Sequence, residues 1–176
     1  MLKENFKAKI THFLLLQKYS QIIAMIYYIP GINIKWLNVS PIISMTEKRM
    51  MKYVIKILKI GTDGRIAMYV EEKNRSWCSS SASNDHRAVT IEVANNGGGP
   101  DWPVSDEAYD ALLDLVTDIC KRNNITKLLW KGDKSLIGQV NKQNMTVHRW
   151  FAAKACPGDY LYNLHPDIVE KVNKRL

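Results

Sequence analysis

The sequence predicts an α/β fold, and three observations lead to this prediction. Short runs rich in β-branched residues recur along the chain, one longer segment has the apolar spacing of an amphipathic helix, and that segment lies between two of the runs. Strands separated by a helix and joined by local loops indicate a layered α/β domain rather than a β-sandwich or a helical bundle. The chain has 176 residues, of which 46% are hydrophobic and 24% charged, so it has the length of one domain with at most a short appendage. This composition excludes collagen-like, low-complexity and fully disordered proteins.

The predicted strands of the C-terminal two thirds are Arg65–Val70, Ala88–Ala94 and Lys127–Trp130. The run Ala88–Ala94 (AVTIEVA) is the richest in β-branched residues, so we expect it at the centre of the sheet. The glycines of Gly61-Thr62-Asp63-Gly64 are typical of a turn before the first of these strands. The segments 71–85 and 131–144 are polar and are expected to be loops.

One long helix is predicted after Ser105, which is a suitable N-cap and is followed by acidic residues that complement the helix dipole. Apolar residues then recur every three or four positions, and Lys121-Arg122 close the helix. A short final helix is expected to begin at Pro166, because proline is favoured in the first turn of a helix.

The charge distribution divides the chain near Ile60. The net charge is +8, and residues 1–60 hold ten Lys and Arg residues against Glu4 and Glu47, whereas residues 61–176 hold equal numbers of each sign. We therefore expect an atypical basic segment, residues 1–59, and a globular domain, residues 60–176. Because the body of the protein carries no basic excess, no nucleic-acid partner is predicted.

The basic segment has several interpretations. The runs Phe13–Leu16 and Ile22–Ile29 are candidate strands, and Met50–Ile60 is consistent with a strand or with a basic amphipathic stretch. Gln21–Asn33 loosely resembles the apolar part of a signal peptide, but no small-residue cleavage site follows it. Core strands, a poorly folded extension and a membrane-surface segment remain alternatives. No apolar run reaches 18 residues, so no transmembrane helix is expected.

The most chemically suggestive stretch places His148, Lys154 and Cys156 within nine residues. Imidazole and thiolate are both good zinc ligands, and a catalytic zinc site has three protein ligands with a fourth position left for water. A lysine beside them could stabilise an oxyanion formed on a polarised carbonyl. From spacing alone, a core or surface histidine and a small apolar cysteine are the more common interpretations. The three cysteines, Cys78, Cys120 and Cys156, are too few and too far apart for a disulfide framework.

The stretch HRWFAAKACPG, residues 148–158, resembles the segment between the second and third zinc ligands of the zinc-dependent N-acetylmuramoyl-L-alanine amidases. This family includes amidase-type phage lysozymes and the peptidoglycan recognition proteins. The blocks GTDGRIAMYVEEKNRSW and NDHRAVTIEVAN resemble the central strands of the same family, in the same order. The resemblance covers residues 60–176 and is greatest to the version found in prophage endolysins of Gram-positive bacteria. It implies a mixed central β-sheet flanked by helices and zinc-dependent hydrolysis of the amide between N-acetylmuramic acid and L-alanine.

The resemblance also implies roles for single residues. His148 and Cys156 match metal ligands, Lys154 matches the group that stabilises the oxyanion, and Glu92 matches a strand carboxylate that acts as general base in some members. Trp77 matches a loop aromatic that lines the cleft. The alternatives are an ion pair of Glu92 with Arg87 or Lys127, and ordinary packing for Trp77. Cys78 stands where many members have histidine, so any role of that histidine in binding is absent here.

The departure from the family lies upstream, where the strand that supplies the first zinc ligand is not recognisable. His12 is the one histidine before His86, and a shifted strand register would be needed for it to be that ligand. Two functions are therefore weighed: a monomeric zinc amidase that acts on peptidoglycan, and a peptidoglycan-binding module that lacks the first ligand. In either case the protein would be bacterial or phage-encoded and would act at the cell wall, after secretion or release on lysis.

Overall fold

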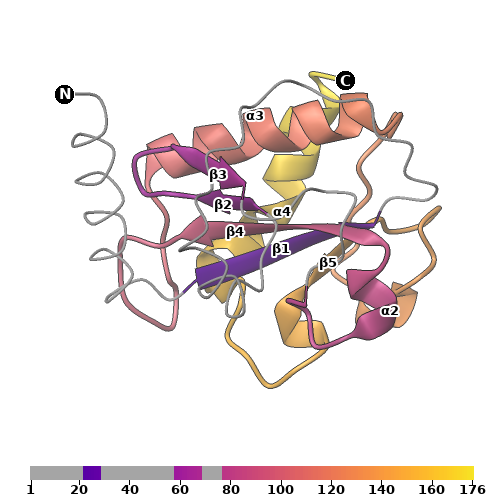
Figure 1. The fold of residues 1–176 in the computed structure, drawn as a ribbon, viewed down its shortest axis with the longest axis horizontal. Helices are drawn as coiled ribbons and strands as arrows, with labels where there is room; N and C mark the ends of the chain where they lie inside the picture. Colours follow the sequence, from indigo (N-terminus) through magenta and orange to yellow (C-terminus); the bar gives the residue numbers. More distant parts are fainter. Residues whose placement is uncertain (1–21, 29–57, 69–76) are drawn as a thin grey trace, which may run out of the picture.

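The computed structural model describes residues 22–28, 58–68 and 77–176, with residues 22–28 described as backbone (Figure 1). Within these ranges, five strands form one sheet in the order β3-β2-β4-β1-β5. The strands are β1 (Ile22–Tyr28), β2 (Leu58–Ile60), β3 (Ile66–Met68), β4 (Ala88–Ala94) and β5 (Met145–Val147). The pair β2–β4 is parallel and the other pairs are antiparallel, so the sheet is mixed. The predicted α/β fold with a mixed central sheet is confirmed.

Strand β4 occupies the middle of the sheet, as its β-branched composition predicts, and all seven of its residues are buried. Its neighbour on one side is β1, which comes from the basic N-terminal segment and pairs with β4 over its full length, from Ile22 opposite Ala94 to Tyr28 opposite Ala88. Strand β1 also pairs with β5. Backbone from the first 59 residues therefore lies inside the sheet, while the division of the chain at residue 60 stays a prediction.

The two faces of the sheet differ in chemistry because side chains alternate along each strand. One face, here called the apolar face, belongs to the main hydrophobic core together with residues of α3 and α4, and its strand residues include Leu58, Ile60, Val89, Ile91, Val93 and Met145. The opposite face, here called the polar face, carries Lys59, Thr90, Glu92 and Thr146, all of them buried. The register confirms the alternation, since Lys59 lies opposite Glu92 while Leu58 and Ile60 lie opposite Ile91 and Val93.

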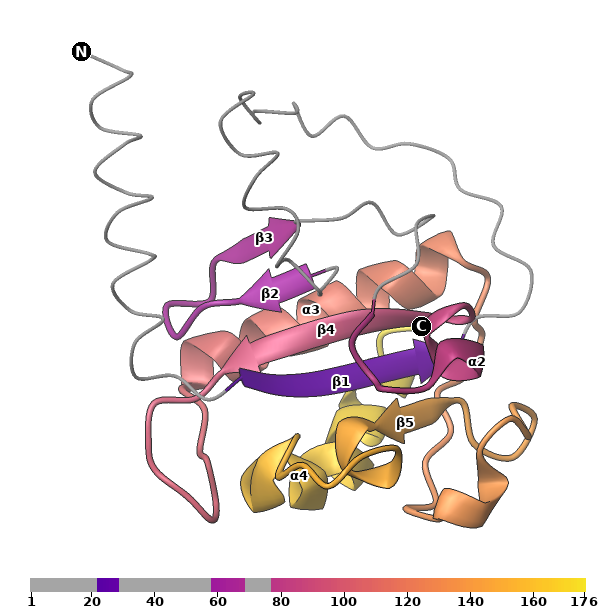
Figure 2. The same ribbon diagram turned by 60° about the horizontal axis from the view of Figure 1, so that its bottom comes forward.

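Three helices of the described residues lie beside the sheet: α2 (Ala82–Asp85), α3 (Asp106–Arg122) and α4 (Gly158–Asn173). Figures 1 and 2 show α3 and α4 on the same side of the sheet, with α2 at the end where β4 begins. The predicted start of α3 is confirmed, because the Ser105 hydroxyl accepts a hydrogen bond from the backbone N–H of Ala108. Short 3₁₀ turns, η3 (Lys134–Leu136) and η4 (His148–Trp150), complete the described elements. No helix in these parts of the chain has the length and apolar character needed to cross a bilayer.

The predicted strand Lys127–Trp130 is wrong, because this extended segment pairs with amide side chains instead of a neighbouring strand. Asn173, near the end of α4, accepts from the Leu128 N–H at 2.8 Å and donates to its carbonyl at 3.0 Å. Asn144 accepts from the Leu129 N–H and donates to the Lys127 carbonyl. These side chains provide the donors and acceptors that a partner strand would otherwise supply.

The predicted start of the last helix at Pro166 is also wrong, since α4 begins eight positions earlier, at Gly158. Proline lacks the N–H of a regular helix interior, and here it lies inside α4. The proline therefore interrupts the backbone hydrogen bonds of the helix. In the same turn, the ring nitrogen Nδ1 of the preceding residue, His165, lies 2.7 Å from the Leu161 carbonyl oxygen.

Other predicted strands correspond to shorter elements or lie outside the described residues. Strand β3 covers the middle of the predicted Arg65–Val70, and β2 is the end of Met50–Ile60. Phe13–Leu16 and His12 lie outside the described ranges.

Candidate functional site

The segment after β5 forms a closed loop that brings the backbones of the two predicted metal ligands together. The chain leaves β5 at Val147 and turns through η4, which begins with His148. The backbone N–H of Arg149 donates to the carbonyl oxygen of Cys156 at 2.9 Å, so the positions next to His148 and at Cys156 are hydrogen-bonded neighbours. His148 and Cys156 are both half-buried, and Lys154, two residues before Cys156, is exposed.

The register of the sheet places Glu92 near the level at which β5 ends, one residue before His148. Glu92 lies opposite Ala24 of β1, and Val147 lies opposite Met25, so the ladder continued by one residue sets His148 beside Ala24 on the other side. Two strand spacings separate the two backbones, about 10 Å. Because the backbone of Val147 is still extended, alternation continued one residue past β5 would set His148 on the face that carries Thr146, which is the polar face with Glu92.

Lys59 is a neighbour of Glu92 that the sequence reasoning did not single out. It lies opposite Glu92 in the parallel pair β2–β4 and is only 6% exposed, while Glu92 is 1% exposed. Removal from water lowers the pKa of Lys59 below its ordinary value, because burial penalises the charged form. The predicted alternative partners of Glu92, Arg87 and Lys127, are both exposed.

A cluster of aromatic rings packs against Trp150, the last residue of η4. The rings of Trp130 and Trp150 stack with their centroids 5.0 Å apart and 5° between their planes, and the imidazole of His165 lies 4.2 Å from Trp130. Tyr162 meets Trp130 edge-on. His165 is fully buried, and this burial lowers its pKa to about 4, so it is neutral at physiological pH. The cluster fixes the turn from which His148 projects.

Trp77 is 68% exposed, beside the buried Cys78, so its side chain is not part of the core. The loop that follows is held by Asp85, whose carboxylate accepts from the N–H of Ser79 at 2.9 Å and also from its hydroxyl. These contacts leave Trp77 on the surface with the backbone after it fixed.

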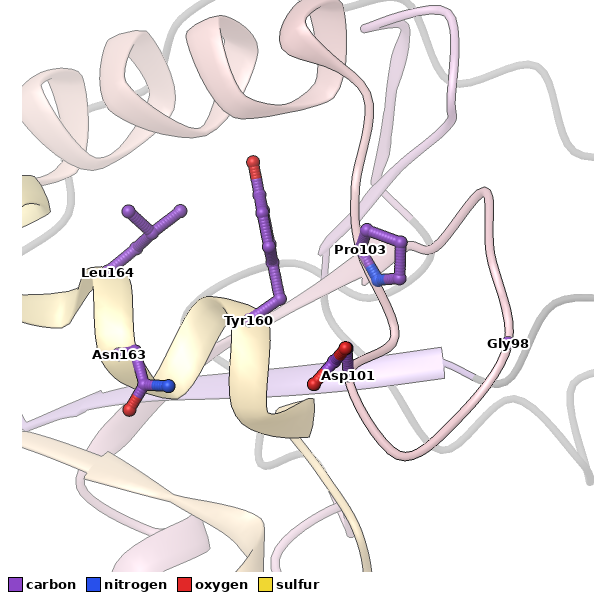
Figure 3. Close-up of a pocket in the computed structure, with 6 residues that line it drawn as sticks. All are labelled: Gly98, Asp101, Pro103, Tyr160, Asn163 and Leu164. Atoms are coloured by element: carbon purple, nitrogen blue, oxygen red, sulfur yellow. The ribbon is translucent and has the colours of Figure 1, made fainter.

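A hollow of about 470 Å³ lies between the loop after β4 and the first turns of α4, and none of the predicted site residues lines it (Figure 3). The Tyr160 ring stands between Leu164 and Pro103, with Asp101 and Asn163 on either side. The predicted ligands His148 and Cys156, and Lys154, belong instead to the closed loop after β5.

The same loop after β4 packs closely on the turn that follows Cys156. Gly158 has a φ of +80°, and a Cβ added there would lie 2.8 Å from the Asp101 carbonyl oxygen and 2.9 Å from Trp102 Cβ. The N–H of Tyr160 donates to the same carbonyl at 3.0 Å. Glycine is therefore required at position 158, and the chain just beyond Cys156 is tightly held.

The donor chemistry of the loop fits part of a zinc site. An imidazole and a thiol come from one closed loop, and both are partly shielded from water, as borderline-soft metal ions prefer. Across residues 22–28, 58–68 and 77–176, no group of three or more His, Cys, Asp or Glu side chains is placed to hold a metal ion. The described residues thus supply two donors of the right kind and not a complete set of three.

Comparison with known proteins identifies the family. The family model described as N-acetylmuramoyl-L-alanine amidase matches residues 44–159, about two thirds of the chain. Searches of the curated proteins and of the solved structures give no match. The matched range includes β2 to β5, Glu92 and the closed loop with both predicted metal ligands. The chain belongs to the N-acetylmuramoyl-L-alanine amidase family, whose members are peptidoglycan amidases and are generally zinc-dependent.

Proposed function

We propose that this protein hydrolyses the amide between N-acetylmuramic acid and L-alanine, with a zinc ion held by His148 and Cys156 and by a third ligand from outside the described residues. The observation that carries the proposal is the closed loop, in which the backbone hydrogen bond from Arg149 to Cys156 joins the residue after His148 to the second proposed ligand, with the exposed Lys154 in the same loop. When bound, zinc lowers the pKa of a coordinated water and polarises the amide carbonyl.

Three residues of the chain would then have separate roles in the reaction. The Glu92 carboxylate, on the polar face near the level at which β5 ends, takes a proton from the attacking water. The Lys154 ammonium donates to the oxygen of the tetrahedral intermediate, where negative charge develops. Trp77, exposed on the surface, contacts the substrate through its ring.

A second candidate is a peptidoglycan-binding module without hydrolysis. The observation that favours it is the donor set, which within the described residues reaches two rather than three. Two ligands bind zinc more weakly than three, so such a protein would hold muropeptide and leave the amide intact.

Metal content distinguishes the two candidates. We expect the purified full-length protein to contain about one zinc ion per chain, and His148→Ala and Cys156→Ala to lose it. The matched controls are His86→Ala, at an exposed histidine, and Cys120→Ala, at a buried cysteine outside the loop. Wall binding by a wild-type protein that neither takes up zinc nor releases peptide would favour the binding module.

The place of action follows from the substrate. We propose that the protein is a prophage-type endolysin that reaches the cell wall by secretion or on lysis and acts as a monomer. Gel filtration of the zinc-loaded protein, together with lysis assays on intact cells and on purified walls, tests these points. A stable dimer, or activity on purified walls alone, would contradict the corresponding part.

A further inference from the structure

Arg149 connects the two ends of the closed loop. It directly follows His148 in the chain, and two of its donors reach the other end of the loop. Its backbone N–H donates to the Cys156 carbonyl at 2.9 Å, and its Nη2 donates to the Ala155 carbonyl at 2.7 Å. A single residue thus ties the neighbour of one proposed metal ligand to the other ligand and to the residue before it.

The guanidinium group is itself fixed by helix α4. Its Nη1 lies 2.9 Å from the carboxylate of Asp159 in the first turn, and its central carbon lies 4.9 Å from the centroid of the Tyr162 ring. The arginine side chain is only 25% exposed. An ordinary surface ion pair adds little order, but a partly buried guanidinium with two hydrogen-bonding partners and an aromatic ring beneath its central carbon is held in one orientation.

We propose that Arg149 is a positioning residue, which holds Cys156 in place relative to His148. This inference rests on the proposed zinc site, because the function of the tether is to preform the spacing of the two ligands. Partners that orient metal ligands typically change metal affinity by about 10- to 100-fold when they are removed.

The planar guanidinium group, with several donors in fixed directions, explains why position 149 is arginine rather than lysine. One nitrogen donates to the Ala155 carbonyl while another donates to Asp159, and the central carbon lies over the Tyr162 ring. A lysine ammonium keeps the charge but cannot make these contacts in the same geometry. Arg149→Lys should therefore behave like Arg149→Ala toward metal.

The test uses the full-length protein with Arg149→Ala, Arg149→Lys and the control Arg175→Ala. Arg175 also contacts an aspartate, Asp114, at 2.7 Å, but on the exposed side of α3 and α4. The zinc dissociation constant is measured by competition with a chelator, and cobalt is added to record the thiolate-to-metal absorption band. We expect both Arg149 variants to bind zinc about 10- to 100-fold more weakly and to show a weakened or shifted cobalt band, with Arg175→Ala unchanged.

A purely structural role gives a different result. In that case the melting temperature of the metal-free Arg149 variants falls while the zinc affinity and the cobalt band of the folded protein stay as in wild type, which would overturn the proposal. If wild type itself takes up no metal, the proposed function fails. The tether is then tested by the iodoacetamide alkylation rate of Cys156 in the metal-free protein, with the modified peptide identified by mass spectrometry. A several-fold faster reaction in Arg149→Ala than in Arg175→Ala supports the tether, and equal rates overturn it.

Discussion

Lys154 and Cys156 lie two positions apart on one loop but in different surroundings. Cys156 is half-buried and its carbonyl is hydrogen-bonded, whereas Lys154 is exposed and its side chain is free of the core. A group that stabilises charge during reaction needs access to the substrate, and a metal ligand needs a fixed position. The two positions therefore differ in the way that the proposed roles require.

This contrast predicts a variant with impaired chemistry and intact folding. Lys154→Ala should lower kcat by about 100- to 1000-fold, the usual effect of losing one oxyanion donor, while zinc content and melting temperature stay as in wild type. The measurement is the initial rate on purified peptidoglycan. Lys142→Ala is the control, since that lysine is exposed on another loop and bonds to Gln139. An equal loss in both variants would remove Lys154 from the mechanism.

His165 predicts a defined acid sensitivity. Burial among Trp130 and Tyr162, with the Arg149 cation nearby, lowers its pKa from 6.5 to about 4. Between these values the unfolded chain binds more protons than the folded one, so stability falls as the pH is lowered from about 6.5 to about 4. The shift corresponds to about 3 kcal/mol.

Urea unfolding of wild type and His165→Leu across this pH range measures the effect. The variant should lose much of the acid dependence, while the control His86→Gln, at an exposed position, keeps it. Parallel pH profiles for His165→Leu and wild type would contradict the assignment.

At the scale of elements, the sequence predicts a helix or strand correctly where the residues that determine it lie within the same segment. Helix α3 was predicted at its correct start because its cap, its acidic first turn and its apolar spacing all lie within the segment. Strand β4 was correctly placed at the centre from its composition. The segment Lys127–Trp130 has strand-like composition, but Asn144 and Asn173, which lie far along the chain, take the place of a partner strand.

The candidate site follows the same rule. His148, Lys154 and Cys156 could be proposed from the sequence because they share one short motif, and their roles stay a prediction. Lys59 and Arg149 were missed, since the importance of the first depends on the parallel register with β4 and that of the second on hydrogen bonds to Ala155, Cys156 and Asp159 that form only in the folded loop. A lysine between two buried apolar residues, Leu58 and Ile60, was the one available signal for Lys59.

The hydrogen bonds between the Asn173 side chain and Leu128 predict that replacing this asparagine of α4 destabilises the protein. Asn173→Ala leaves the N–H and the carbonyl of buried Leu128 without these partners, so the free energy of unfolding should fall by about 2 to 4 kcal/mol. Asn163→Ala, at an exposed position of the same helix, should stay within about 0.5 kcal/mol of wild type. Chemical denaturation of both variants checks this, and similar midpoints for the two would contradict the pairing.

At the scale of the whole molecule, the two faces of the sheet differ: one contributes to the hydrophobic core, and the other carries buried polar residues. Its apolar face packs with α3 and α4 in the main core, and its polar face carries Lys59, Glu92 and the end of β5 that leads to His148. Polar residues buried on one face of a sheet lower the apolar area available for stability. A ligand that binds the folded protein and not the unfolded chain stabilises the fold by mass action.

Zinc should accordingly raise the melting temperature of the whole protein. At a free concentration of about 100 times the dissociation constant, binding contributes about 2.7 kcal/mol, or about 5 to 10 °C for a chain of this size. Cys156→Ala should show no such rise in differential scanning calorimetry, whereas Cys120→Ala should keep it. A wild-type melting temperature that does not respond to zinc would contradict a zinc site in the folded protein.

The most direct test of the proposed function is the chemical nature of the ends that the protein creates in peptidoglycan. Purified walls are treated with zinc-loaded wild type, and new amino groups and new reducing sugar ends are counted separately. The proposed function predicts new N-terminal L-alanine, no new reducing ends, and loss of the reaction in His148→Ala. Reducing ends without N-terminal L-alanine, or full activity in His148→Ala, would contradict it.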